Sequence, residues 1–324
     1  MTTGYVNQTH SASAPLGAAR RALRFLALGA CLPYLTLKTA WLAGSRIGIP
    51  EGSVLREPGL FFTVANAATL LMDAVLVVIV LALTLPWGRR IPAWLLTLPV
   101  FTATGLLTPI LGGFPALTLM RALGGGPDRA QAAASEPFLD DWVFNMVYVG
   151  FSVQALALAG LFVPYARERW GHLWQGTVGA PMSGAIRAVA VAGTAGAMAF
   201  AALQLYWIAG GTAGLSAERV ANWSSDSVMM CVVHSMCGLA AAAGGLLLAF
   251  GGRRPVRGPL ALAWVGGSAA AAWGLWLSLA VLAPEADPAK QATSVMQLAY
   301  AGQMITGLLV ATVLTRFLGS RRAG

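Results

Sequence analysis

The chain has 324 residues, of which 57% are hydrophobic and only 10% are charged, and its formal net charge is +9. Soluble domains carry about 25% charged residues, so this composition excludes an ordinary water-soluble fold and predicts a protein embedded in a membrane. The basic residues flank apolar segments and do not alternate with exposed aromatic residues, so nucleic-acid binding is not expected.

The N-terminal segment, residues 1–18, is polar and rich in small side chains, and we expect it to be a disordered cytoplasmic tail. Arg20, Arg21 and Arg24 surround the start of the first apolar run, an arrangement that superficially resembles a signal peptide. Cleavage is not expected, because this run is too long for a signal peptide and becomes polar in its second half.

Eight apolar runs follow the tail, and each is long enough to cross the hydrocarbon core of a bilayer, which needs about 20 residues. Backbone groups cannot stay unpaired in hydrocarbon, so each run is expected to be a helix. The predicted spans are residues 23–44, 61–86, 92–112, 142–164, 188–209, 227–250, 258–282 and 294–317. The fold class is therefore an all-α membrane protein with eight transmembrane helices.

The charges predict which side of the membrane each connection occupies. With eight spans, both ends of the chain lie on one side, and most arginines fall in the segments on that side. Acidic residues run the other way, and Glu168 is the only one predicted on the arginine-rich side. Cytoplasmic loops are enriched in basic residues, so both termini are predicted to be cytoplasmic and the protein to be multi-pass in the cytoplasmic membrane.

Several uncommon residues recur in the same order in the two halves of the chain. The matched stretches are Trp41 to Gly44 with Trp207 to Gly210, Arg89-Arg90 with Arg253-Arg254, and Tyr148 to Gly150 with Tyr300 to Gly302. This recurrence predicts two four-helix repeats, residues 19–170 and 171–324. Because four is an even number, both repeats enter the membrane in the same direction and are parallel, related by an axis along the membrane normal.

Two charged side chains fall inside the first predicted repeat, where a charge is costly. Asp73 lies near the middle of the second span, and Lys38 lies near the outer end of the first, within reach of a Lys38–Asp73 pair. Three readings stay open: a lysine that snorkels to the interface, a neutral aspartic acid that links helices, and a functional ion pair or substrate counter-ion. In the second repeat Gln204 and Cys237 occupy the corresponding positions.

Other polar side chains within the spans complete the set of candidates. His234 is the only histidine in a span, and histidine is suited to carry a proton or bind a ligand, although many histidines only hydrogen-bond between helices. Gln154 and Gln303 lie near the paired Tyr148 and Tyr300. These four residues are predicted to line a seam between the two halves.

The chain shows no signature of catalysis or of a cofactor. Its three cysteines, Cys31, Cys231 and Cys237, form no CxxC motif, so neither a disulfide framework nor a metal site is expected. There is no glycine-rich phosphate loop, no HExxH and no GxSxG. We therefore expect no catalytic residues and no cofactor.

The leading functional hypothesis is transport or export of a small molecule or ion. Asp73 would bind a cation or proton, His234 would relay or sense protonation, and Lys38 would screen Asp73. The alternatives are a non-transporting scaffold or accessory subunit and a membrane-embedded enzyme acting on a lipid or isoprenoid substrate. The expected partners are the lipid bilayer and, because the chain has no nucleotide-binding domain, a partner subunit or ATPase if transport is driven by ATP.

In composition and topology the chain resembles the multi-pass integral membrane proteins of high-GC Gram-positive bacteria. The resemblance covers these two properties alone and implies no particular activity.

Overall fold

The computed structural model describes residues 17–51, 53–56, 59–124, 139–283 and 287–323. Within these ranges it contains eight helices that are long and apolar enough to cross a membrane, which confirms the predicted number of spans and makes the chain a multi-pass membrane protein. These helices are α1 (Ala18–Leu42), α2 (Leu60–Thr84), α3 (Ala93–Ala122), α5 (Asp141–Trp170), α6 (Gly184–Ile208), α8 (Ser225–Ala249), α9 (Arg257–Ala280) and α10 (Ser294–Ala323). Most of the predicted tail, residues 1–16, lies outside the described residues.

Some predicted helix ends are wrong. The third span was expected to end at residue 112, but α3 continues to Ala122 and contains Pro109 and Pro115. Proline removes one backbone donor and usually ends a helix in water, whereas a helix inside a membrane bundle tolerates it because neighbouring helices, Ser and Thr side chains and local adjustments of the helix satisfy the freed carbonyl. Two further helices, α5 and α10, also extend beyond their predicted ends, to Trp170 and Ala323.

Short elements join the long helices. They are the 3-10 helices η1 (Val54–Arg56), η2 (Pro86–Arg90) and η3 (Gly171–Trp174), the short helix α7 (Ala217–Ala221), and the strands β1 (Thr177–Gly179) and β2 (Gly252–Pro255). The two strands pair in an antiparallel manner, with Thr177 opposite Pro255 and Gly179 opposite Gly252. This pairing fastens the segment before α6 to the turn between α8 and α9.

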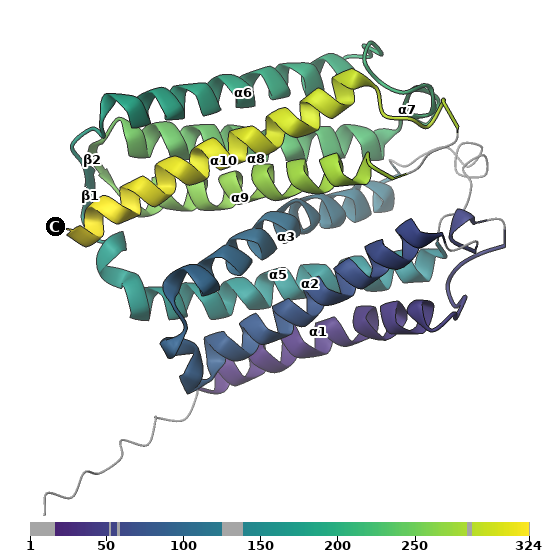
Figure 1. Ribbon diagram of the computed structural model, residues 1–324, viewed down its shortest axis with the longest axis horizontal. Coiled ribbons are helices and arrows are strands. Elements are labelled where there is room, and N and C mark those ends of the chain that lie inside the picture. Colours follow the sequence, from purple (N-terminus) through teal and green to yellow (C-terminus); the bar gives the residue numbers. More distant parts are fainter. Residues whose placement is uncertain (1–16, 52, 57–58, 125–138, 284–286, 324) are drawn as a thin grey trace, which may run out of the picture.

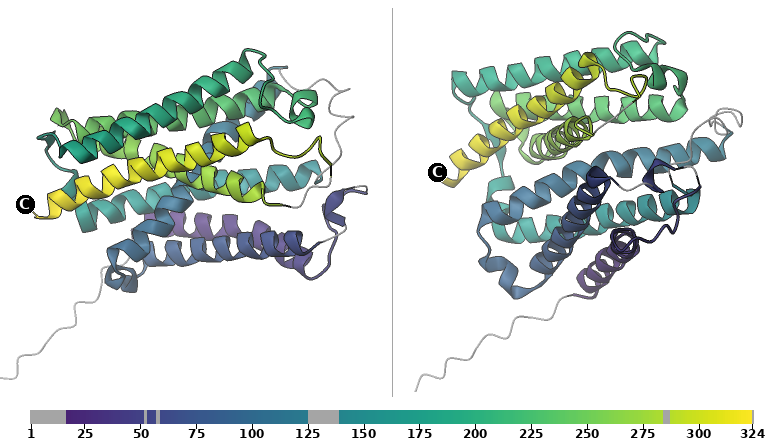
Figure 2. Two further views of the ribbon diagram at one scale, coloured as in Figure 1. Left: turned by 45° about the horizontal axis from the view of Figure 1, so that its top comes forward. Right: turned by 45° about the vertical axis from the view of Figure 1, so that its right-hand side comes forward.

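The long helices form two groups of four, which lie side by side in Figure 1 and in both views of Figure 2. One group contains α1, α2, α3 and α5, and the other contains α6, α8, α9 and α10. Each group has its own apolar core, and the side chain of Trp264 packs against both cores. The two groups are joined mainly where α3 packs along α9.

The joint between α3 and α9 depends on small residues. Gly105 of α3 lies so close to α9 that an added β-carbon would meet the backbone carbonyl of Ser268 and the β-carbon of Ala272. One turn away, the ring of Phe101 stands edge-on against Trp264, with 5.2 Å between the ring centroids. Close backbone approach of this kind is how helices associate when lipid removes the hydrophobic driving force.

The two groups differ in how tightly their middle helices pack. In the second group α8 packs closely along α9, and a β-carbon on Gly266 would lie 2.7 Å from the carbonyl oxygen of Cys237. In the first group α2 makes few contacts with α3 and is held mainly by α1. The first group is therefore open between α2 and α3.

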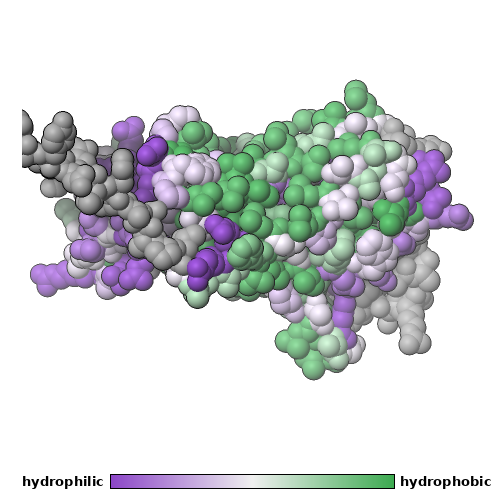
Figure 3. All heavy atoms as spheres, turned by 90° about the horizontal axis from the view of Figure 1, so that it is seen from below, coloured by the Kyte–Doolittle hydropathy of each residue, from purple (hydrophilic) through white to green (hydrophobic). Residues whose placement is uncertain are grey.

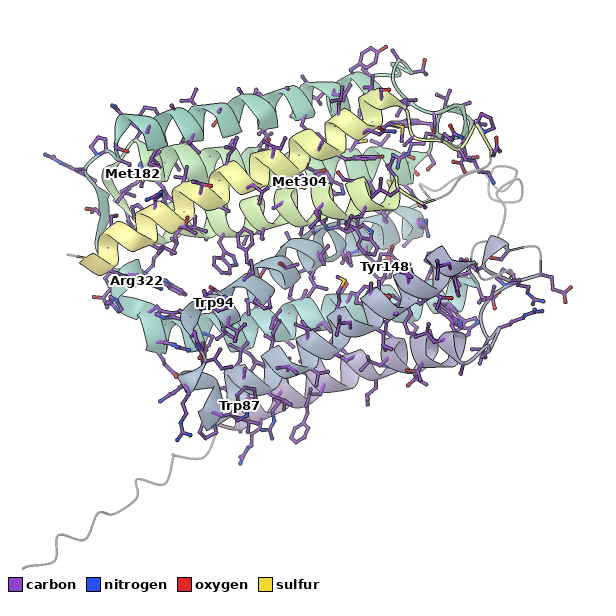
Figure 4. All side chains as sticks on the ribbon, in the orientation of Figure 1. Trp87, Trp94, Tyr148, Met182, Met304 and Arg322 are labelled. Carbon is purple, nitrogen blue, oxygen red and sulfur yellow. The ribbon has the colours of Figure 1, made fainter. Side chains whose placement is uncertain are left out.

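The surface has the pattern of a membrane protein. Figure 3 shows a broad apolar belt between two polar ends. Helix α1 begins and α10 ends at the same end of the bundle (Figure 1), and Arg322, Trp87 and Trp94 lie toward that end in Figure 4. Arg20 and Arg89 both pair there with Glu168.

The turns that follow α1 and α6 have the same internal bonding. The indole nitrogen of Trp41 donates to the carbonyl oxygen of Ile47 at 2.9 Å, and the indole nitrogen of Trp207 donates to that of Ala213 at 3.0 Å. Each turn also contains two glycines with positive φ, the left-handed conformation that glycine adopts readily; they are Gly44 and Gly48 in the first turn and Gly210 and Gly214 in the second.

Candidate functional site

A cavity of about 540 Å³ fills the opening between α2 and α3, with α1, α5 and α9 forming its other walls. Leu71, Met72 and Leu98 lie at its rim and expose 65%, 39% and 61% of their surface. These apolar side chains lie in the belt that faces hydrocarbon, so the cavity opens sideways toward the lipid and not toward an aqueous end of the bundle. Its volume falls in the range of small-molecule sites, which is about 300–1,000 Å³.

Asp73 is the only charged side chain among the described residues that line this cavity. It is carried by α2, whose neighbouring side chains are almost all apolar, and only 7% of its surface is exposed. Its Oδ2 atom has no hydrogen-bond partner, and no described residue forms an ion pair with the carboxyl group. A buried carboxylate without a hydrogen bond or an ion pair is costly, so this group is suited to take up a proton or to bind a cation.

Two further predicted residues line the same cavity. Gln154 of α5 is 1% exposed, and its amide nitrogen donates to the Cys31 sulfur at 3.2 Å while its Oε1 atom has no partner. Tyr148, one turn and a half earlier on α5, lies in the space between α2 and α3 in Figure 4. Its ring stacks on Phe114, with 5.5 Å between the centroids.

His234 and Gln303 lie outside this cavity but contact its wall. The Gln303 amide nitrogen and His234 Nδ1 are 3.0 Å apart, and the His234 ring stands edge-on to Trp273 at 5.2 Å. Trp273 lines the cavity, and its indole nitrogen donates to the carbonyl oxygen of Leu106 at 3.0 Å. The His234–Gln303 pair therefore supports the wall from the second group of helices.

The structure gives Lys38 a partner other than Asp73. The Lys38 amine donates to Oδ1 of Asn66 at 2.6 Å and lies over the rings of Tyr34 and Trp41, at 5.0 and 4.9 Å from their centroids. The direct Lys38–Asp73 pair that the sequence left open is not among the ion pairs of the described residues. Asn66 lies about two turns before Asp73 on α2, so the amine bonds to an uncharged oxygen nearer the end of the bundle.

Tyr300 is separated from the other candidates. It lines a second cavity of about 480 Å³ at the opposite end from the chain termini, together with Arg219, Glu218 and Gln297. The predicted seam is therefore divided among three places: the cavity beside α2, the His234–Gln303 pair and this second cavity.

Sequence reasoning missed several residues of the main cavity. Tyr34, Phe151, Trp273 and Trp276 supply most of its aromatic surface. A signal was present for Trp273, because it lies inside a span and away from the interfaces where tryptophan usually collects. Across the described residues, no group of three or more His, Cys, Asp or Glu side chains is placed to hold a metal ion.

The chain matches no protein-family profile, no curated protein and no solved structure. The cavity is therefore the feature of the molecule that bears on its function.

Proposed function

We propose that this protein transports or exports a small molecule, and that the cavity between α2 and α3 is the substrate site. The observation that supports this most directly is Asp73, which is almost fully buried on the cavity wall and has no hydrogen-bond or ionic partner. A charge-bearing residue inside the membrane is expensive and commonly marks a substrate or ion pathway. Lys38, by contrast, is paired with Asn66.

We further propose that the two groups of helices are parallel repeats. Trp41 and its acceptor Ile47 are displaced from Trp207 and Ala213 by the same number of positions, and both pairs make the same bond. The α3–α9 joint supports the same relation. Phe101 contacts Trp264 and Gly105 lies against Ser268, and in both pairs the two residues are separated by the same number of positions, as equivalent residues of two repeats would be. Contacts of equivalent residues with each other are expected beside a two-fold axis, and sites in such proteins lie near the boundary between repeats.

The proposed orientation places the chain ends in the cytoplasm, in the cytoplasmic membrane. The end of the bundle where α1 begins and α10 ends carries Arg20, Arg89, Arg169 and Arg322. Basic residues concentrate on the cytoplasmic side of multi-pass proteins. The second cavity, which contains Tyr300, would then face the outside.

In this mechanism Asp73 binds the cation or proton that accompanies, or is, the substrate. Lys38 holds a positive charge on the outer side of Asp73 without pairing with it, and His234 acts on the substrate site through Trp273. The energy comes from an ion gradient coupled through Asp73 or from a partner ATPase subunit.

The test is to express the wild-type chain, Asp73→Asn and the exposed control Asp141→Asn in a bacterial host. Small molecules retained by the cells are then compared by mass spectrometry with those in cells carrying an empty vector. We expect the wild type and Asp141→Asn to change the amount of at least one compound, and Asp73→Asn to match the vector at equal membrane abundance and unchanged thermal stability. Full activity of Asp73→Asn, or no difference between wild type and vector, would refute the proposal.

The other two functions predict different results. A scaffold would tolerate substitution of Asp73 and would bind its partner through faces rich in small residues. Gly244 and Gly266 offer no such face, because both pack against neighbouring backbone inside the molecule. An enzyme acting on a lipid gains support from the sideways opening of the cavity, and it requires a second acid or base beside Asp73. The lining residues described for this cavity include no other carboxylate and no histidine.

A further inference from the structure

We infer that the cavity beside α2 recognises a lipophilic amine: a molecule with an aromatic or branched apolar body and a protonated nitrogen that still carries N–H groups. This inference rests on the proposed function and names the substrate class of the same site.

The charge of the ligand follows from Asp73. Its carboxyl group is the single charged group that the described lining residues contribute, and it forms no ion pair and leaves Oδ2 without a hydrogen bond. Lys38, the nearest cation identified on α1, is already held by Asn66 and does not line the cavity. A cationic ligand would therefore gain a buried charge-assisted contact, and an anionic ligand would meet an uncompensated carboxylate.

The N–H groups of the ligand follow from the remaining hydrogen-bonding capacity of the wall. The donors of Thr69, Thr102 and Trp273 are all engaged with backbone carbonyl oxygens. Gln154 donates one of its two N–H groups to the Cys31 sulfur, and its Oε1 atom remains without a partner, as does Oδ2 of Asp73. Both buried atoms of the wall that lack a partner are therefore acceptors, although the hydroxyl groups of Tyr34 and Tyr148 and the indole N–H of Trp276 also line the cavity. An ammonium with N–H groups donates hydrogen bonds to acceptors of this kind, whereas a fully alkylated cation donates none.

The body of the ligand follows from the rest of the lining. Tyr34, Tyr148, Phe151, Trp273 and Trp276 supply aromatic rings, and leucine, isoleucine and methionine side chains supply most of the other surface. The rings of Tyr34 and Phe151 are already in edge contact at 5.0 Å, so they form one continuous aromatic wall. Aromatic faces attract cations as well as apolar groups, which favours an amine attached to such a body.

The route to the site agrees with this class. The rim residues Leu71, Met72 and Leu98 are exposed and apolar, and they lie where the bundle faces hydrocarbon. A lipophilic amine dissolves in the bilayer and reaches the opening laterally, whereas a polar cation such as a metal ion does not.

The test uses four probes with one body: 3,3-diphenylpropylamine, its trimethylammonium analogue, 3,3-diphenylpropanol and 3,3-diphenylpropanoate. Binding to the purified full-length chain in phosphatidylcholine nanodiscs is measured by equilibrium dialysis, with empty nanodiscs correcting for partition into lipid. We expect the affinity to be highest for the amine, lower for the trimethylammonium compound and lowest for the alcohol and the carboxylate. Asp73→Asn should weaken amine binding about thirtyfold or more, and Asp73→Glu should restore part of it.

Gln154→Leu separates the N–H contact from the charge. It should weaken binding of the amine about tenfold and leave the trimethylammonium compound nearly unchanged. Asp141→Asn, the same chemical change at an exposed helix start outside the cavity, should leave all four affinities unchanged. Thermal unfolding of each variant shows whether it is folded.

Two results would overturn the inference: alcohol or carboxylate binding as tightly as the amine, or amine binding that survives in folded Asp73→Asn. Equal binding of the amine and the trimethylammonium compound would also overturn the requirement for N–H groups. The proposed transport function would stand in any of these cases if Asp73→Asn still abolished the cellular effect. Conversely, selective amine binding without any cellular effect of the wild type would refute transport and leave the ligand class intact.

Discussion

Gly105→Ala tests the joint between the two groups of helices. In the structure, an added β-carbon at this position would overlap the backbone carbonyl of Ser268 and lie 2.9 Å from the β-carbon of Ala272. A clash with backbone cannot be relieved by a rotamer change, so α3 and α9 have to separate. Separation would also move Trp273, whose indole nitrogen bonds to the carbonyl oxygen of Leu106 next to Gly105.

The expected loss of stability in Gly105→Ala follows from two opposing effects. Overpacking a close helix contact typically costs about 1–3 kcal/mol, and a backbone clash belongs at the upper end of that range. Replacing glycine by alanine within a helix contributes about 1 kcal/mol in the opposite direction. The net loss is therefore about 2 kcal/mol, which lowers the melting temperature of a chain of this size by about 3 °C.

Gly29→Ala is the matched control. Gly29 lies within α1, and no atom lies within 4 Å of the position its β-carbon would occupy. Gly29→Ala should raise the free energy of unfolding by up to about 1 kcal/mol, because alanine favours the helix and its β-carbon meets no clash. Thermal unfolding of both variants in the same nanodiscs measures the difference. A melting temperature for Gly105→Ala equal to or above that of Gly29→Ala would refute the argument that this joint is held by close backbone approach.

Three other changes test particular contacts by thermal unfolding of the purified chain. Trp41→Phe and Trp207→Phe each remove one indole N–H bond and should lower stability by about 1 kcal/mol each, and markedly unequal losses would contradict the equivalence of the two turns. Glu168→Gln should cost no more than about 1 kcal/mol, because its side chain is 43% exposed, and the loss should shrink in high salt; a salt-independent loss would contradict this. His234→Ala leaves the amide of Gln303 without its partner and should cost about 1–3 kcal/mol, while weakening amine binding less than Asp73→Asn does; the reverse order would place His234 in the ligand site.

The sequence predicted the membrane-spanning helices well because their signal is local. A span needs a long apolar run and satisfies all of its backbone bonds internally, so composition alone locates it. The helix ends were predicted less well, because they depend on what surrounds the chain. The continuation of α3 through Pro109 and Pro115 to Ala122 follows from packing against neighbours, which no window of residues reports.

The site was predicted only in part. Asp73 was identified because a charge inside a span is rare and costly. The choice of partner for Lys38 could not be predicted, because it depends on the rotation of α2, which places Asn66 within 2.6 Å of the amine. Tyr34 and Phe151 were missed because an aromatic residue within a span is ordinary in composition, whereas the position of Trp273 away from the interfaces was a signal that was not used. Only the separation of α2 from α3 gives these rings a cavity to line.

The proposed duplication explains why the cavity lies in the first group of helices. In the second group, Gly266 of α9 lies against the backbone of Cys237 and Ala241, and this contact brings α8 onto α9. Aligning the repeats places Ala103 at the position of Gly266 and Asp73 at that of Cys237, and both of these residues line the cavity.

Two kinds of residue at those positions account for the difference. The β-carbon of Ala103 prevents the approach that Gly266 allows, because a β-carbon on Gly266 would lie 2.7 Å from a carbonyl oxygen. The carboxyl group of Asp73 adds a second obstacle, since closing α2 onto α3 would seal it in apolar surroundings without a proton or cation as partner. The cavity thus lies where a close helix contact of the second group has been prevented in the first, and the residue that most opposes its closure is the one proposed to bind the ligand.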